Sequence, residues 1–592
     1  MNLWTSLLYN GRQSLRPLRS QLHPPKQQSQ TTEPSILGFG RTSCSTLLHI
    51  ALIVLLIFVA YSGSFDGAFV SDDIRRVRDN PIIQSLQWSH IKEIFTTFDG
   101  ANYMPLKVLS LAVDYQLWGP TPTGFHITNL LIHISCAFVI YIILMRMGMR
   151  PPPAFLTALL WALHPLQVES VAWISERKNV LSGLFFFAAF YFYLGFSENR
   201  RIRTYLAVLG LYSLALLTKM NTMVLPALFL AYEATYRFRL RIRDLLVSLP
   251  FLLLAAFVAW YNLAGNPIHG TTWHGGSVVV TWLSTSVVFI RYLRNLIMPI
   301  DLHLWYEVPL YDSLKDPVVL LSLSIIGTIT AATIWLVYTR RQWGFWVLWF
   351  GITLAPMLNI IVPFRSLMQD RYMYLALLGP LALVVNYLAT AMNSPAVRRG
   401  LMTLVGAVIL MYISLTYRQV EVWSNPLTLW TSGAVRFAFP TDEIVLIPND
   451  HNARVTYLRD ALAVNPSSGI LHNNLAVLHF NAGHIDDALP GMETAAKLEP
   501  ENAVILLNLG RAYARLGRTR AAEQLLSRAV VLAPYSSVIR LNLARVYLSL
   551  GNTKAARYEL DAFARLRPAS SRIFHKERVY LERLEAAQRR QK

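Results

Sequence analysis

Long apolar runs separated by short polar loops dominate the chain up to about residue 420. The first run, residues 45–63, has about 19 residues, which is enough for a helix to cross a bilayer. Backbone groups in lipid must hydrogen-bond within their own segment, so these runs are predicted to be helices. Segments 105–118 and 278–298 are predicted to lie in the interface or to enter the membrane and return. The predicted spans, about 11 in number, are 45–63, 125–147, 154–173, 179–197, 204–218, 222–236, 244–265, 317–338, 345–363, 371–391 and 399–417.

Lysine and arginine cluster in every second loop between these runs. Cytoplasmic loops of membrane proteins carry an excess of these residues, so the basic loops are predicted to face the cytoplasm. An odd number of crossings then places the C-terminus outside, provided that 278–298 makes no net crossing. The basic positions are the N-terminal tail, Arg146 and Arg150, 200–203, 237–243, Arg340 and Arg341, and Arg398 and Arg399. The predicted outer loops are 64–104, 174–178, 219–221, 266–277, 299–316 and 364–370.

The last part of the chain contains an internal repeat. Pro466, Pro500, Pro534 and Pro568 follow one another at intervals of 34 residues. Small residues recur within each period where two helices must approach closely, and a glycine recurs between them, at Gly483, Gly517 and Gly551. This period and residue pattern are typical of tetratricopeptide repeats, which stack helix pairs into a solenoid.

Together these patterns predict an all-α protein: a polytopic bundle of transmembrane helices followed by an α-solenoid. The predicted domains are a disordered basic cytoplasmic tail (1–44), a membrane domain (45–420) with an acidic outer loop (64–104), a linker with a degenerate repeat (421–466), three tetratricopeptide repeats (467–569) and a C-terminal capping helix (570–592).

Composition agrees with a membrane protein. The chain is 54% hydrophobic and 15% charged, whereas soluble proteins carry about 25% charged residues. The formal net charge of +20 comes from clusters between apolar runs, so it is read as an orientation signal and no nucleic-acid partner is predicted. Cys44 and Cys136 imply no disulfide framework or metal site. The absence of a phosphate-binding glycine loop or a serine nucleophile elbow argues against an ATP-driven pump or a serine hydrolase.

Two adjacent carboxylates, Asp72 and Asp73, lie a few residues beyond the first predicted span. A carboxylate at this boundary can act as a general base on an acceptor hydroxyl while a lipid-borne substrate approaches from the membrane. The alternative is a solvated turn or a helix N-cap, where aspartate is favoured.

Polar residues also occur inside the predicted spans. His126, Asn129 and His133 share one helical face, and His164 and Glu169 lie near the end of the third span. Polar groups in a membrane are costly and usually face a cavity or a partner. These residues are therefore candidates for lining a pocket, with interhelical hydrogen bonding as the alternative.

Several cations fall in the predicted outer loops, where basic residues are disfavoured: Arg177, Lys178, Lys219 and Arg371. They are candidates for holding a phosphate or diphosphate. The alternative for Arg177 and Lys178 is contact with lipid head groups, and the alternative for Arg371 is an ion pair with Asp370.

The order of these motifs resembles one family over nearly the whole chain from residue 45: the transmembrane and tetratricopeptide-repeat O-mannosyltransferases, in a bacterial-type form. Its members are glycosyltransferases of the GT-C class. The motifs that carry the resemblance are Asp72-Asp73, Tyr103-x-Pro105-Leu106, Gly124-Phe125-His126-x-x-Asn129-Leu130-Leu131-x-His133, His164-Pro165-x-x-x-Glu169, Arg177-Lys178 and the repeats.

The resemblance implies transfer of a sugar, with mannose expected, from a polyprenyl-phosphate donor to a Ser or Thr hydroxyl of an exported protein. Asp72 or Asp73 would be the catalytic carboxylate, and Glu169, Arg177, Lys178, Lys219 and Arg371 would shape the donor site. The repeats would bind the acceptor polypeptide. No metal ligand is assigned; the class includes metal-dependent and metal-independent enzymes, so a divalent metal stays possible.

The related protein mannosyltransferases have Asp-Glu where this chain has Asp72-Asp73, which leaves the identity of the base open. The Ser175-Glu176-Arg177-Lys178 sequence is closer to bacterial members. The expected location is a bacterial inner membrane with periplasmic repeats, or the endoplasmic reticulum with lumenal repeats in a eukaryote. A membrane-anchored tetratricopeptide scaffold without enzymatic activity is the main alternative, and a transporter the second.

Overall fold

The computed structural model describes residues 44–100, 102–238, 240–264, 273–304, 306, 308–339, 341–364, 366–391, 394–426, 428–429, 432, 451–566, 578–579, 581–582 and 585–586. The chain divides into two compact units, Met1–His49 and Ile50–Lys592. The described part of the first unit is the start of helix α2 (Cys44–Tyr61). The described residues of the second unit are helices and loops, without a β-strand. The all-α prediction is therefore confirmed.

Six of the described helices are long and apolar enough to cross a membrane, or up to seven if one bent pair forms a single span. The predicted count of about 11 spans is not confirmed. Several predicted spans are short helices because prolines or turns interrupt them: α6 ends at Leu163, before Pro165. The six are Cys44–Asp66, Pro122–Arg146 (α5), Ile174–Asn199 (containing α8, Arg177–Asn199), Ile242–Ala264 (α11), Pro317–Thr339 (α13) and Pro395–Val422 (α17).

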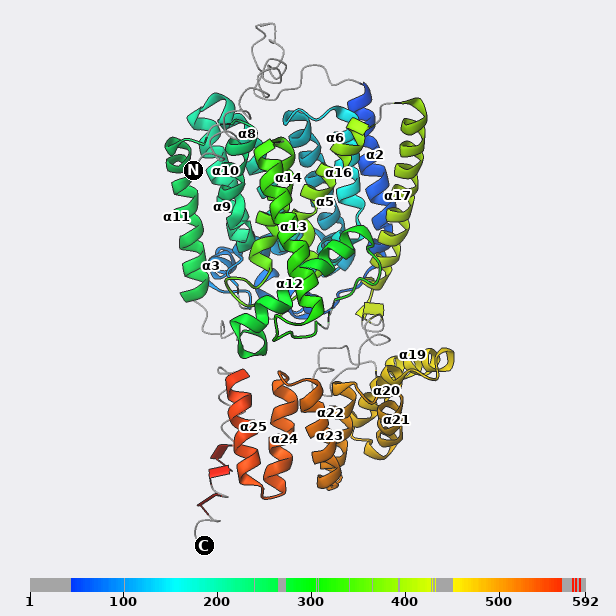
Figure 1. The fold of residues 1–592 in the computed structure, drawn as a ribbon. Coiled ribbons are helices and arrows are strands. Elements are labelled where there is room, and N and C mark those ends of the chain that lie inside the picture. Colours follow the sequence, from blue (N-terminus) through cyan, green and yellow to red (C-terminus); the bar gives the residue numbers. More distant parts are fainter. Residues whose placement is uncertain are drawn as a thin grey trace, which may run out of the picture. The chain divides into compact units, whose positions relative to one another are not determined.

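Shorter helices pack among these long ones (Figure 1). They include α9, which packs along α8, and α14, which packs against α16. At this second contact Gly379 lies so close to α14 that a Cβ atom there would be 2.4 Å from the carbonyl oxygen of Trp346. The shorter helices are α6 (Pro151–Leu163), α9 (Ile202–Thr218), α10 (Leu225–Thr235), α14 (Arg341–Leu354) and α16 (Leu378–Ala391). Helix α12 (Val278–Ile297) has 20 residues but is not among the candidate spans.

The bent pair consists of Asp370–Ala376 and α16, which meet at an angle of 54°. Helix α15 (Met373–Ala376) occupies the first arm. Two buried indoles satisfy carbonyl groups at the bend: Trp161 donates to Tyr374 O at 3.0 Å and Trp349 donates to Leu375 O at 2.9 Å. The bend is thus held by side chains from α6 and α14.

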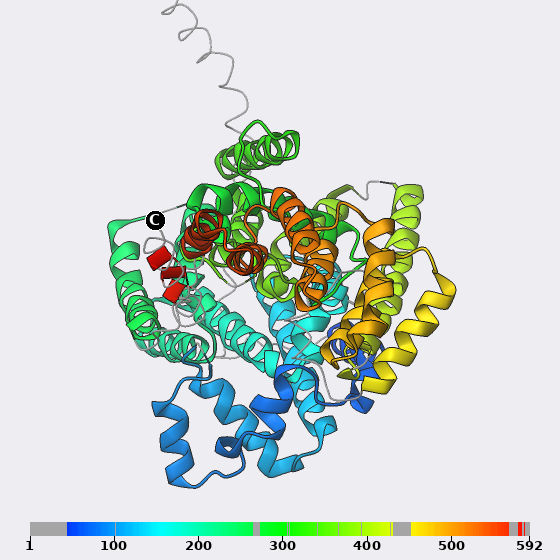
Figure 2. The same cartoon turned by 90° about the horizontal axis from the view of Figure 1, so that it is seen from below.

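The first predicted outer loop is folded. It contains most of η1 (Ser62–Asp66), the π-turn η2 (Ile74–Arg78), η3 (Pro81–Ile83) and α3 (Trp88–Thr96), and the next segment, 105–118, forms helix α4 (Pro105–Trp118). In the view of Figure 2 its blue helices lie at the margin of the bundle. Phe69, Val77, Ile94 and Leu111 form a small hydrophobic cluster with Phe125 of α5. This cluster anchors the loop to a membrane helix.

Between residues 451 and 566, which the structure describes without a gap, three helix pairs follow one another: α20 (Gly469–Asn481) with α21 (Ile485–Leu498), α22 (Ala503–Arg515) with α23 (Thr519–Leu532), and α24 (Ser537–Ser549) with α25 (Thr553–Leu566). Helix α19 (His451–Val464) precedes them. Gly483, Gly517 and Gly551 have φ values of 87°, 75° and 71°, the left-handed conformation that glycine adopts without strain. The predicted tail (1–44), residues 433–450 of the predicted linker and the predicted capping helix (570–592) lie almost entirely outside the described residues.

Candidate active site

Asp73 ties the first loop to the start of α8. Its Oδ1 accepts a hydrogen bond from the Ser175 backbone N–H at 2.7 Å, and its Oδ2 accepts one from Val70 N–H at 3.2 Å. Burial raises the pKa of Asp73 to about 7, although these hydrogen bonds and the charge of Lys107 act in the opposite direction. Asp73 is fully buried, so it fixes two segments far apart in the sequence.

Asp72 points in a different direction, toward solvent. Its side chain is 42% exposed and lies 3.2 Å from Arg76 Nε. The preceding Ser71 has φ 51°, and this backbone turn separates the two aspartates from the end of the apolar segment. Asp72 is therefore the accessible carboxylate of the pair.

A chain of ion pairs extends from Asp72. Arg76 also lies 3.4 Å from Asp99, and Lys107 Nζ lies 2.6 Å from the same carboxylate. Burial alone would raise the pKa of Asp99, but the charges of Lys107 and Arg76 outweigh it and lower the pKa to about 2. Lys178 contributes to this lowering, so its ammonium group is electrostatically linked to Asp99.

Glu176 collects several of the predicted donor-site cations. Lys178 Nζ lies 2.7 Å from its carboxylate and Arg371 Nε lies 3.5 Å away. Asn179 donates to the other Glu176 oxygen at 2.9 Å and accepts a hydrogen bond from Lys219 Nζ. Lys178, Lys219 and Arg371 therefore surround one buried carboxylate.

Burial lowers the pKa of Lys219 to about 7. The carboxylates of Glu176 and Glu169 favour its charged form, and the cations Lys178 and Arg371 oppose it. Lys219 therefore changes charge near neutral pH.

Arg371 is held on both sides. Its Nη1 lies 2.5 Å from Glu169, its backbone N–H donates to the same carboxylate at 2.8 Å, and its guanidinium lies 5.2 Å from the centre of the Trp173 ring. Asp370 accepts a hydrogen bond from Tyr306 at 2.7 Å. The ion pair considered for Asp370 and Arg371 is thus replaced by a pair between Arg371 and Glu169.

We refer to these linked residues as the outer charge cluster. They come from the first loop, α4, α7 (Val168–Ala172), η5 (Ile174–Glu176), the start of α8, the end of α9 and the bent pair. Its members are Asp72, Arg76, Asp99, Lys107, Glu169, Glu176, Lys178, Asn179, Lys219 and Arg371.

Arg177 is directed away from this cluster, although it is adjacent to Lys178 in the sequence. It is fully buried and lies 2.5 Å from Asp114. It also donates to Phe125 O at 3.0 Å and to the side-chain oxygen of Asn129. Arg177 therefore joins α4 and α5 to α8, and its charge is neutralised within the bundle.

The four predicted pocket-lining residues are buried and contact neighbouring segments. Asn129 donates to Val171 O at 3.0 Å, and the His133 ring lies 3.0 Å from the Tyr374 hydroxyl and 3.1 Å from Ala162 O. His164 lies 3.2 Å from Leu296 O. A Cβ atom at Gly67 would lie 2.9 Å from the His126 ring. The contacts of Asn129, His133 and His164 match the alternative of interhelical hydrogen bonding.

Sequence reasoning did not single out Asp99, Lys107, Asp114 or Glu176. Lys107 and Asp114 lie on α4, a segment interpreted only as interfacial, and a lysine with an aspartate seven residues later in an apolar helix signals ion pairing. Glu176 stands beside Arg177 in the sequence. Two of its partners, Lys178 and Asn179, are local, whereas Arg371 comes from a distant segment. No local pattern identifies such a centre.

The carboxylates of the outer charge cluster are each paired with a cation, as in Asp72 with Arg76 and Asp99 with Lys107. This pairing leaves the cluster without a set of carboxylates directed at a shared metal position. Within the described ranges, His479, His484 and Asp487, at the turn between α20 and α21, are near enough to hold an ion, with ligand atoms within 4.8 Å of one another.

Known proteins match the repeat region and also a larger part of the chain. A tetratricopeptide repeat family profile matches residues 473–537. The C-terminal region contains tetratricopeptide repeats. The chain is also similar to proteins named protein O-mannosyl-transferase from several animals.

A relative from Caenorhabditis elegans is 24% identical over 481 residues, which cover 76% of this chain and 63% of the relative. Protein O-mannosyl-transferase TMTC4 of Homo sapiens is 31% identical over 166 residues, covering 24% of this chain and 22% of that protein. TMTC1 of Mus musculus is 33% identical over 145 residues, covering 23% and 15%. The chain thus matches less than two thirds of the length of these relatives.

Proposed function

We propose that this protein is a multi-pass membrane glycosyltransferase of the GT-C class. It transfers a sugar, with mannose as the first candidate, from a polyprenyl-phosphate donor to a Ser or Thr hydroxyl of an exported polypeptide. The outer charge cluster carries the proposal, because it combines one accessible carboxylate with several cations beside apolar helices. The names of the similar proteins support the reaction type.

Asp72 is the residue we assign as general base. It is the more exposed aspartate, so an acceptor hydroxyl can reach it. Asp73 is buried and occupied by two backbone N–H groups, so we assign it to positioning the loop. Arg76 lies 3.2 Å from the Asp72 carboxylate and orients it.

Lys178, Lys219 and Arg371 are assigned to the donor phosphate. During transfer the acceptor oxygen loses its proton to Asp72 and bonds to the anomeric carbon of the sugar. The bond between that carbon and the phosphate oxygen breaks, and the electron pair stays on the phosphate. Cations beside the leaving phosphate stabilise this developing charge. Glu176 and Glu169 hold these cations in position.

The tetratricopeptide repeats are assigned to the acceptor polypeptide. A stacked array of helix pairs provides an extended surface for protein binding. The proposal requires the array and the outer charge cluster to lie on the same, non-cytoplasmic side. That side would be the periplasm in a bacterium or the lumen of the endoplasmic reticulum in a eukaryote.

Substitution of Asp72 by asparagine tests the proposal. In a transfer assay with polyprenyl-phosphate mannose and an acceptor peptide, Asp72→Asn is expected to lower kcat at least about 100-fold, the effect of losing a general base. Asp79→Asn is the matched control, because Asp79 lies in the same loop and pairs only with the exposed Arg78. Equal activity of the two purified variants would remove Asp72 from the mechanism.

A membrane-anchored scaffold without enzymatic activity is the second candidate, and the tetratricopeptide repeats favour it. Under this alternative, purified protein would bind an exported partner in a stable complex and would not transfer sugar from any of a panel of polyprenyl-phosphate donors. Asp72→Asn would then leave the complex unchanged.

A further inference from the structure

A polar cavity of about 490 Å³ lies at the C-terminal end of α8. The outer charge cluster lies at the other end of this helix, where Arg177 begins it. Since α8 has 23 residues, the two sites are about 34 Å apart along the helix. The cavity is therefore separate from the site assigned to sugar transfer.

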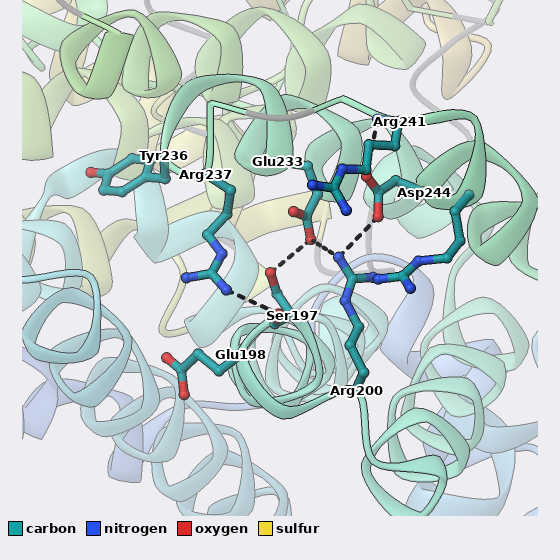
Figure 3. A pocket seen from close by; sticks show the side chains of 9 residues that line it. Ser197, Glu198, Arg200, Glu233, Tyr236, Arg237, Arg241 and Asp244 are labelled. Atoms are coloured by element: carbon teal, nitrogen blue, oxygen red, sulfur yellow. Dashed lines mark hydrogen bonds and ion pairs between the residues drawn. The ribbon is translucent and has the colours of Figure 1, made fainter.

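Arg200, Glu233 and Asp244 lie close together in the wall of the cavity (Figure 3). Arg200 Nη2 lies 2.9 Å from Asp244 and 3.4 Å from Glu233, and the Ser197 hydroxyl donates to Glu233 at 2.7 Å. The Arg241 backbone N–H donates to Asp244 at 3.1 Å. Both buried carboxylates are thus engaged within the wall and need no further cation.

Three more arginines line the cavity: Arg237, Arg241 and Arg243. All three are exposed, and Arg237 donates to Ser197 O at 3.2 Å. Among the residues that the structure describes, the guanidinium groups of Arg241 and Arg243 have no acidic partner within ion-pair distance, and Nη1 of Arg200 is buried without a hydrogen-bond acceptor. The cavity therefore has an excess of guanidinium donors.

Guanidinium groups bind phosphate oxygens through paired, charge-assisted hydrogen bonds. A tetrahedral anion with several oxygens fits this lining better than a single carboxylate does, because more than one arginine is open to the cavity. The volume of about 490 Å³ accommodates a phosphate with a small attached group.

The segment that supplies these arginines also carries apolar side chains. Phe238, Leu240 and Ile242 alternate with the arginines, and each is more than half exposed. α11, which follows directly, is one of the candidate spans. Exposed apolar residues next to a span, interleaved with arginines, are suited to the boundary between lipid tails and head groups. This position favours a phosphate that belongs to a lipid.

We propose that this cavity binds the phosphate of an anionic phospholipid head group, with Arg237, Arg241 and Arg243 as its ligands. Arg200 holds the two buried carboxylates away from the bound phosphate. The site does not depend on the glycosyltransferase assignment, since its residues and those of the outer charge cluster lie at opposite ends of α8.

The test measures lipid binding to the purified full-length protein in neutral detergent. A fluorescent short-chain phosphatidic acid is titrated and followed by anisotropy, with the phosphatidylcholine analogue and inorganic phosphate as competitors. The cavity variant is Arg241→Gln with Arg243→Gln. The matched control is Arg398→Gln with Arg399→Gln, which removes the same charge from exposed residues at the start of α17, outside the cavity.

The cavity variant is expected to weaken phosphatidic acid binding at least about ten-fold, the effect of losing charge-assisted hydrogen bonds, and the control less than about two-fold. Phosphatidylcholine and inorganic phosphate should compete only at much higher concentrations. An equal loss of phosphatidic acid affinity in both variants would mean that the lipid responds to the overall surface charge and not to the cavity, which would overturn the proposal. If inorganic phosphate displaced the fluorescent phosphatidic acid at concentrations as low as those at which the lipid itself binds, the bound phosphate would not need to belong to a lipid, and this part of the proposal would be overturned. Arg243→Gln alone serves if the double variant fails to fold.

Discussion

Two adjacent residues of the same type occupy opposite environments at the outer charge cluster. Asp72 is partly exposed beside Arg76, whereas Asp73 is buried and receives two backbone N–H groups. The sequence identified both aspartates as candidates. It could not show which of the two side chains is buried, because that depends on the backbone turn at Ser71. Burial and hydrogen bonding therefore distinguish the environments of the two residues.

We expect Asp73→Asn to destabilise the fold by about 1–3 kcal/mol at pH 5, because the new amide group faces a backbone N–H donor that it cannot satisfy. A carboxyl pKa raised to about 7 in the folded protein stabilises the fold below about pH 4. That contribution is lost as pH rises through 7, so the difference in melting temperature between wild type and variant should shrink between pH 5 and pH 8. A difference that grows over this range would contradict the burial argument.

Lys219 provides a second prediction about single residues. Its pKa of about 7 means that it is charged below neutral pH and uncharged above it. KM for the polyprenyl-phosphate donor is therefore expected to rise as pH increases through 7, because the cation beside the phosphate is lost. Lys219→Arg keeps the charge at all these pH values, so its KM should vary less with pH. Identical pH profiles for both proteins would separate Lys219 from the donor phosphate.

Elements were more predictable than the contacts between them. The repeat period located the helix pairs of residues 469–566 because each pair repeats the same small residues and turn glycine. The spans were less predictable. Hydropathy detects apolar length, but a proline or a turn can end a helix before it reaches 18 residues, as Pro165 does after α6. The ion pair between Arg177 and Asp114 also escaped prediction, because it joins residues 63 positions apart.

Close helix contact gives a prediction at this scale. Gly379→Ala would place a Cβ atom 2.4 Å from Trp346 O and 2.9 Å from Phe350 N of α14, so α14 and α16 must separate. We expect a loss of about 1–3 kcal/mol of stability, measured as a lower melting temperature in detergent. Gly351→Ala on α14 is the matched control, since nothing lies within 4 Å of its added Cβ. Equal melting temperatures of the two variants would show that the contact is not tight.

For the whole molecule, the proposed reaction depends on which side of the membrane each part occupies. Positive charge in alternate loops predicts that the first loop and the repeats share the non-cytoplasmic side. Six described helices, or up to seven, are long enough to span the membrane, and these two numbers place the C-terminus on opposite sides. Sidedness therefore has to be measured directly.

Single cysteines introduced at Ser89 and Lys554, after replacement of Cys44 and Cys136, test the predicted arrangement. Both new positions are exposed. In intact inverted vesicles, a membrane-impermeant maleimide should label neither of them but should label a cysteine at Arg399 in a basic loop. Labelling of Ser89→Cys and Lys554→Cys from opposite faces would end the proposed meeting of donor and acceptor.

The bend between Asp370–Ala376 and α16 makes the position of Arg371 sensitive to the thickness of the bilayer. Because indoles from α6 and α14 hold its free carbonyls, the depth of Arg371 follows the tilt of those two helices. Membrane thickness influences helix tilt. We therefore expect thin and thick lipid mixtures to shift this guanidinium relative to the head-group plane, so that acyl-chain length becomes a regulator of how readily a lipid-linked anion is captured.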